Sequence, residues 1–113
     1  MMLTYVFHSC FVLETEKAIL IFDYWLDLNG VVPPFLKKDK PVYVFSSHFH
    51  EDHFNSAIFE WKKQCGDITY ILSKDIAMKS VSSGLAEIIS NFIHYLLPIR
   101  WQHNILFVVS ILE

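Results

Sequence analysis

The order of apolar and polar positions near the N-terminus predicts three β-strands. Residues 3–7 and 10–14 are rich in β-branched and aromatic side chains, which suit a pleated surface. The polar segment 15–17 follows and predicts a hairpin turn. The run 18–22 is continuously apolar and ends at Asp23, which predicts a strand covered on both faces.

The middle of the chain predicts a loop and then a βαβ unit. Residues 24–40 contain an Asn-Gly pair and a Pro-Pro pair, which predict a long irregular loop. Residues 42–45 predict a buried strand, and apolar residues then recur at helical spacing behind Asn55, a candidate N-cap. A further apolar strand over residues 68–72 completes a unit with the order strand, helix, strand.

The C-terminal part predicts two helices and one strand. Asp75 can cap a helix that runs to about Val81, and a second helix over residues 85–97 would end at Pro98. Residues 105–112 predict a very hydrophobic strand. Polar residues interrupt this apolar region before it reaches a bilayer-spanning length, so the sequence predicts no transmembrane helix.

Composition indicates one globular domain over residues 1–113, of the α/β (α+β) class. The chain of 113 residues is 53% apolar and 19% charged, unlike a disordered protein. Its net charge of -3 supplies no basic surface for nucleic acid. Cys10 and Cys65 lack CxxC spacing and the N-terminus lacks the features of a signal peptide, so we expect reduced thiols and a cytoplasmic protein.

A cluster of histidines follows the predicted strand at residues 42–45. His48, His50, Asp52 and His53 fall within six consecutive positions. In an extended segment His48 and His50 project to the same side and can bind one metal ion. Asp52 and His53 can reach a second ion, and two ions roughly 3.5 to 4 Å apart activate a bridging water. The residues indicate zinc, as one or two ions, and do not distinguish it from manganese or iron.

Two other interpretations compete with a catalytic metal site. The cluster could be a solvated polar loop between a strand and a helix, although such loops normally use Gly, Asn, Asp and Ser. It could also be a structural zinc site, although closed structural sites favour thiolates and the cluster contains no cysteine.

On these residues the chain resembles the metallo-β-lactamase superfamily, whose signature is HxHxDH at the end of a buried strand. It is most similar to the branch that includes lactonases acting on sugar phosphates. The similarity covers about residues 2–76, with the hairpin at residues 4–14, the strand at 19–23, and the strand with its metal loop at 42–53. The resemblance implies the N-terminal half of an αββα sandwich, and a metal-dependent hydrolase acting on an ester, lactone or phosphoester as its small-molecule substrate.

The resemblance also implies roles for individual residues. His48 and His50 would bind one zinc ion, and Asp52 and His53 the other. Asp52 would be the catalytic residue that orients or deprotonates the attacking water. Asp23 would support the metal loop through hydrogen bonds; the alternative is an ordinary turn residue at a strand end. His8, with its neighbours Ser9 and Cys10, could line the metal cleft, although a lone histidine at a strand end is more often structural.

The segment 77–113 does not resemble the family. Residues 84–113 contain three charged side chains in thirty positions, against eighteen in the preceding eighty-three. The family's remaining ligands come from later strands, and we do not assign His94 or His103 to metal.

The alternative function is therefore a truncated, inactive fragment. An uncovered apolar sheet predicts a homo-oligomer in either case. A small membrane-associated protein is a third hypothesis, which rests on the apolar tail; we expect no membrane partner.

Overall fold

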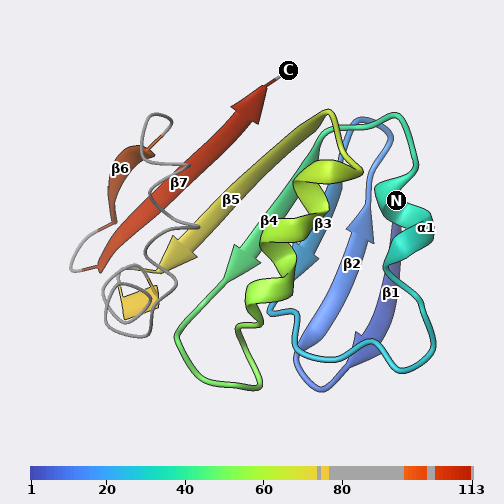
Figure 1. Cartoon of the computed structure of the whole chain (residues 1–113), viewed down its shortest axis with the longest axis horizontal. Helices are drawn as coiled ribbons and strands as arrows, with labels where there is room; N and C mark the ends of the chain where they lie inside the picture. The colour runs from blue at the N-terminus through green and yellow to red at the C-terminus, as the bar shows by residue number, and fades with distance from the viewer. Residues whose placement is uncertain (74, 77–95, 102–103, 113) are drawn as a thin grey trace.

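The computed structural model describes residues 1–73, 75–76, 96–101 and 104–112. They form a mixed α/β fold around one seven-stranded sheet, which confirms the predicted fold class (Figure 1). The elements are β1 (Met2–Phe7), β2 (Cys10–Glu14), β3 (Ile19–Phe22), α1 (Pro33–Leu36), β4 (Val42–Ser46), η1 (Ser56–Lys63), β5 (Asp67–Ser73), β6 (Leu96–Trp101) and β7 (Asn104–Leu112).

The sheet has a parallel centre between antiparallel flanks. Its strand order is β1-β2-β3-β4-β5-β7-β6. β3, β4 and β5 are parallel neighbours, while β1 to β3 form an antiparallel meander and β7 pairs antiparallel with both β5 and β6. The predicted unit of strand, helix and strand is confirmed as β4, η1 and β5. The carboxyl ends of β3, β4 and β5 consequently meet at one edge of the sheet, where parallel folds place their ligands.

The two elements between β3 and β5 differ in detail from the prediction. The long loop contains one helical turn, α1, with proline at its first positions. Proline suits this place because the first N–H groups of a helix have no intrahelical partner. The predicted helix behind Asn55 is present as a 3₁₀ helix, and the Asn55 side chain accepts a hydrogen bond from Ala57 N at 2.9 Å. The N-cap prediction is therefore confirmed.

The prediction of a helix ending at Pro98 is wrong where the structure describes it. Leu96 and Leu97 belong to β6 and pair with Val109 and Val108 of β7. Pro98 lies within the same strand, opposite Phe107. A strand at the end of the sheet can contain proline, because the N–H that proline lacks has no ladder partner on its open side. The remainder of both predicted C-terminal helices beyond Ile76, with His94, lies outside the described residues, as does His103.

The core lies between the sheet and η1. Alternate residues of the central strands are buried on this side, among them Ile21, Val44 and Tyr70. The Tyr70 hydroxyl donates a hydrogen bond of 2.7 Å to the Ile58 carbonyl, which joins β5 to η1. None of the helices in the described part of the chain has the length and apolarity needed to span a lipid bilayer.

The opposite face of the sheet is apolar but incompletely covered. A cross-strand row runs through Tyr5, Phe11, Phe22 and Phe45, and the rings of Phe22 and Phe45 stack at 4.9 Å between centroids. Tyr5 is 57% exposed, and the other three are partly exposed. The prediction that β3 is covered on both faces is therefore wrong in part: Ile19 and Ile21 are buried, whereas Leu20 and Phe22 are not. Self-association through this face stays a prediction.

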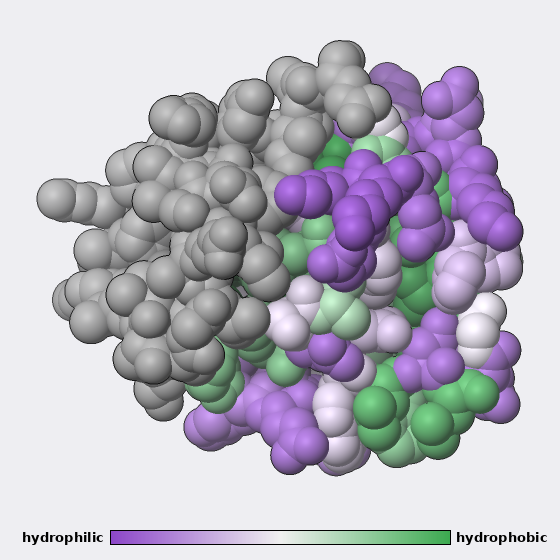
Figure 2. Space-filling view, viewed as in Figure 1, coloured by the Kyte–Doolittle hydropathy of each residue, from purple (hydrophilic) through white to green (hydrophobic). Residues whose placement is uncertain are grey.

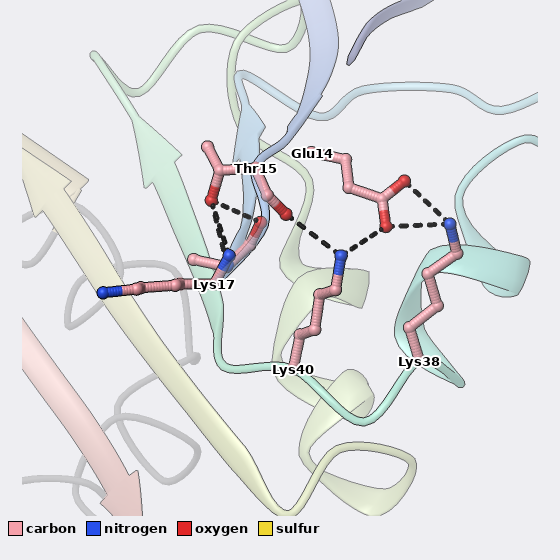
Figure 3. Close-up of polar contacts among 6 residues, drawn as sticks. Glu14, Thr15, Lys17, Lys38 and Lys40 are labelled. Carbon is pink, nitrogen blue, oxygen red and sulfur yellow. Dashed lines mark hydrogen bonds and ion pairs between the residues drawn. The ribbon is translucent and has the colours of Figure 1, made fainter. Parts of the chain in front are cut away.

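A cluster of charged side chains lies at the end of the sheet where β3 and β4 begin, opposite their carboxyl ends. The Glu14 carboxylate accepts hydrogen bonds from Lys38 Nζ at 2.7 and 2.9 Å and from Lys40 Nζ at 2.9 Å (Figure 3). Lys40 Nζ also donates to the Thr15 carbonyl at 3.0 Å. These contacts tie the β2–β3 hairpin to the chain that enters β4. The surface at this end is hydrophilic, while hydrophobic residues gather near the loops at the lower end of the sheet (Figure 2).

The Glu14 contacts predict a pH dependence of stability. Hydrogen bonds from Lys38 and Lys40 lower the pKa of Glu14 below its ordinary 4.5. A carboxyl with a lowered folded-state pKa stabilises the protein above its unfolded-state pKa, and this contribution is lost as the pH falls through the folded-state value. We expect Glu14→Gln to lower the free energy of unfolding at pH 7, and the difference from the unchanged protein to shrink below about pH 4.5. Urea unfolding at both pH values measures it. Glu16→Gln is the matched control, and an equal loss at both pH values would contradict the prediction.

Candidate metal centre

The histidine cluster lies in the loop between β4 and η1, at the carboxyl edge of the parallel strands. Asp23 lies beside it at the end of β3, and its N–H donates to the Phe45 carbonyl at 2.8 Å, which extends the β3–β4 ladder. Asp23 then takes a left-handed conformation with φ of 48°. This residue type tolerates such a backbone better than most. The turn leaves the carboxylate facing the loop that follows β4.

The structure brings the four predicted ligand residues close to one another in pairs. The ring centroids of His48 and His50 are 4.6 Å apart, and those of His48 and His53 are 3.9 Å apart. The Asp52 Oδ2 atom is 3.4 Å from His53 Nε2. The backbone route differs from the extended segment assumed above: His53 N and Phe54 N both donate to the His50 carbonyl, at 2.8 and 2.9 Å, which closes a compact turn.

Asp23 supports the loop and sets the tautomer of His53. Its Oδ1 accepts from Ser47 N at 2.7 Å, and its Oδ2 accepts from Ser47 Oγ at 2.9 Å and contacts His53 Nδ1 at 3.0 Å. An ionised carboxylate only accepts hydrogen bonds, so His53 Nδ1 carries the proton. The Nε2 atom of His53 is then either a free lone pair or, in the imidazolium, a second donor.

Ser47 fixes the tautomer of His48 in a similar way. The Ser47 hydroxyl proton is donated to Asp23, so the Ser47 oxygen must accept the proton of His48 Nδ1, 2.9 Å away. In their neutral forms His48 and His53 therefore both carry hydrogen on Nδ1 and a lone pair on Nε2. A histidine ligand held by a carboxylate at its other nitrogen is the usual arrangement around bound zinc.

The donor set fits a divalent cation. In the neutral tautomer, the Nε2 lone pair of His53 faces an Asp52 oxygen 3.4 Å away. Two acceptors at this distance repel each other unless a proton or a cation lies between them. Imidazole nitrogens with a carboxylate oxygen are ligands that zinc, manganese and iron accept. Within the described ranges, however, no group of three or more such side chains is already arranged around a single point as an ion would require.

His8 lies at the edge of the cluster. Its Nδ1 atom is 3.7 Å from Asp52 Oδ2, its side chain is 50% exposed, and its ring meets that of Trp25 edge-on at 5.5 Å. The expectation that His8 lies near the metal loop is therefore supported. Cys10 does not line a cleft open to solvent as expected, because it is fully buried. Burial, with the charges of Asp27 and Asp23, raises the pKa of the Cys10 thiol to about 12, so it remains protonated at neutral pH.

Ser47 and Asp75 are two supporting residues to which sequence reasoning gave no role at the site. Asp75 was predicted to cap a helix; in the structure its Oδ2 accepts a hydrogen bond of 2.9 Å from Phe49 N, in the middle of the metal loop. Ser73 Oγ donates to the other carboxylate oxygen. Its position in the sequence could have indicated this role. Asp75 follows β5, and the carboxyl ends of β5 and β4 lie at the same edge of the sheet.

Comparison with known proteins supports part of this picture. No family model and no solved structure matches the chain. A curated protein named "UPF0173 metal-dependent hydrolase", from Desulforamulus reducens, is 40% identical over 58 residues, which are 51% of this chain and 25% of that protein. The chain thus spans about a quarter of the length of the relative it matches. Over half of the chain, this match points to the metallo-β-lactamase-like family.

Proposed function

We propose that the chain is a metal-dependent hydrolase of the metallo-β-lactamase type, which binds one or two zinc ions and hydrolyses a small ester, lactone or phosphoester. The observation that carries the proposal is the close spacing of His48 to His50 and His53, and of Asp52 to His53, in a loop that Asp23 supports. The partial match to a protein named as a metal-dependent hydrolase supports the general class.

Each residue has a distinct part in the proposed reaction. His48, His50 and His53 would supply nitrogen ligands, and Asp52 a carboxylate oxygen that also orients the attacking water. When bound, the metal supplies a lowered pKa for that water and a positive charge for the developing oxyanion. Asp23 and Ser47 position the rings of His53 and His48 by fixing their Nδ1 protons. With the proton fixed on Nδ1, the Nε2 lone pair of each ring stays available to bind the metal.

Zinc binding by the unchanged chain and by a double variant tests the proposal. We expect His48→Ala/His50→Ala to lose bound zinc, measured by elemental analysis after gel filtration, and to lose hydrolysis of ester and phosphoester substrates. Two of the four ligands would be missing, and the remaining pair, Asp52 and His53, would leave at least half of the coordination to water. His103→Ala is the control, since that histidine is not assigned to metal. Unchanged zinc content in the double variant would refute the proposal.

The alternative is an inactive fragment of this kind of hydrolase, and the same experiment separates the two. It is favoured by the lack of a preformed three-ligand group in the described residues. The alternative predicts weak zinc binding, or none, without hydrolysis in a broad esterase and phosphodiesterase screen. Zinc-dependent turnover that disappears in His48→Ala/His50→Ala would exclude it.

A further inference from the structure

A pocket of about 490 Å³ lies directly beside the metal loop. Its lining comes from the loop after β3, from the metal loop and from the start of η1. His50 is part of that lining, so the pocket adjoins the candidate metal centre. The volume lies within the ~300–1,000 Å³ of small-molecule sites in proteins. A molecule whose reacting bond is at the centre can therefore place a neighbouring group in this pocket.

Half of the residues that line the pocket are apolar. These are Trp25, Leu26, Phe49 and Phe54. The rings of Phe49 and Phe54 lie 5.5 Å apart, and Phe54 continues to Phe59 at 6.0 Å between centroids. Because Phe54 and Phe59 are buried core residues, this wall is continuous with the protein interior. Such a surface gains free energy by covering an apolar group.

Hydrogen bonds hold the two sides of the pocket in place. Asn55 Nδ2 donates to the Trp25 carbonyl at 2.6 Å, which ties the loop after β3 to the start of η1. On the other side, Asp75 accepts from Phe49 N at 2.9 Å. These bonds restrain the backbone of both walls without a ligand, which lowers the conformational entropy lost on binding.

The charge of the lining distinguishes between substrate classes. Of the described residues that line the pocket, none is lysine or arginine, and Glu51 carries a negative charge. Proteins that bind phosphate use cations or groups of N–H donors. A phosphate placed here would lose its hydration next to a carboxylate and apolar side chains, at a large cost in free energy. An uncharged group does not incur this cost.

We propose that this pocket binds the uncharged, apolar acyl part of a carboxylic ester or lactone whose carbonyl lies at the metal centre. The choice of substrate class rests on the proposed function and narrows it. In the reaction, a bond forms between the water oxygen and the carbonyl carbon, the ester C–O bond breaks, and one water proton is transferred to the leaving alcohol oxygen. Phosphoesters are disfavoured because their charge would lie against this lining.

Binding of two ligands that differ only in charge tests the pocket independently of catalysis. We expect 1-hexanol to bind at least about ten-fold more tightly than hexyl phosphate, measured by tryptophan fluorescence with EDTA and again with zinc. The variant Trp25→Phe should remove the fluorescence change, since Trp25 lines the pocket. Equal or tighter binding of hexyl phosphate with EDTA, or no binding of 1-hexanol, would overturn the inference.

A pair of leucine variants locates the effect. Leu26→Lys places a cation in the lining and should reverse the preference towards hexyl phosphate. Leu28→Lys is the matched control, because Leu28 lies in the same loop, is 73% exposed and is not part of the lining. An equal shift in both variants would show that overall charge, not the pocket, decides the preference.

The outcomes for the pocket and for the proposed function can be told apart. With zinc bound, kcat/KM for 4-nitrophenyl hexanoate should exceed that for the acetate by at least about ten-fold. If zinc does not bind but 1-hexanol is still preferred, the pocket is supported as a site for apolar groups and the proposed function fails. If zinc supports hydrolysis of phosphoesters alone, the proposed function is kept and this inference is overturned.

Discussion

Asparagine at position 23 is expected to weaken zinc binding by about 10–100-fold, although it has the size of the aspartate it replaces. Asp23 accepts hydrogen bonds from Ser47 N, from Ser47 Oγ and from His53 Nδ1. An amide has one accepting oxygen and one donating NH₂ group, so it cannot accept from all three. If the oxygen keeps the Ser47 N–H, the NH₂ group faces His53, and the ring must move its proton to Nε2. The lone pair proposed to bind the metal is then lost.

Competition between the protein and a zinc chelator measures this change in affinity. Nitrogen chemical shifts of His53 in the metal-free protein provide a second readout, because they report which ring nitrogen carries the proton. The backbone should not confound the comparison, since asparagine accepts the φ of 48° at this position. Asp39→Asn, an exposed change of the same kind, is the control. An Asp23→Asn protein with normal zinc affinity and an unchanged tautomer would contradict the assigned role.

The local elements could be predicted from the sequence because their signals are contained within short segments. The meander of β1 to β3 follows from β-branched and aromatic runs separated by polar turns. The placement of the histidines at the end of a strand follows from the apolar run that precedes them. Asn55 was recognisable as an N-cap because its side chain acts on a residue only two positions away.

The support of the metal loop could not be read in the same way, because it depends on contacts between distant segments. The Asp23 carboxylate reaches Ser47, 24 residues later in the chain, and Asp75 reaches Phe49 across 26 residues. Each contact requires the carboxyl ends of neighbouring parallel strands to lie together, which only the sheet order establishes. The error at Pro98 has a related cause. Proline commonly ends a helix, but it also fits a strand at the edge of a sheet, and only the pairing with β7 shows that Pro98 lies in such a strand.

The burial of Tyr70 makes it the position where a single change should have the largest effect on stability. The side chain is fully buried between β5 and η1, and its ring contacts Phe59 at 5.2 Å between centroids. Replacing a large buried aromatic residue by alanine costs roughly 3–5 kcal/mol. Small domains have a free energy of unfolding of about 5–15 kcal/mol. Tyr70→Ala is therefore expected to leave much of the protein unfolded or aggregated.

Tyr70→Phe separates the hydrogen bond from the packing and keeps the prediction measurable if the alanine variant does not fold. It keeps the ring and removes the hydroxyl that donates to the Ile58 carbonyl at 2.7 Å. A typical intramolecular hydrogen bond contributes about 0.5–1.5 kcal/mol to stability, so we expect a loss of that size in urea unfolding. Tyr5→Phe is the matched control: Tyr5 is 57% exposed, and its variant should change stability by less than about 0.5 kcal/mol. Equal effects at positions 70 and 5 would show that the Tyr70 hydroxyl does not hold η1 against the sheet.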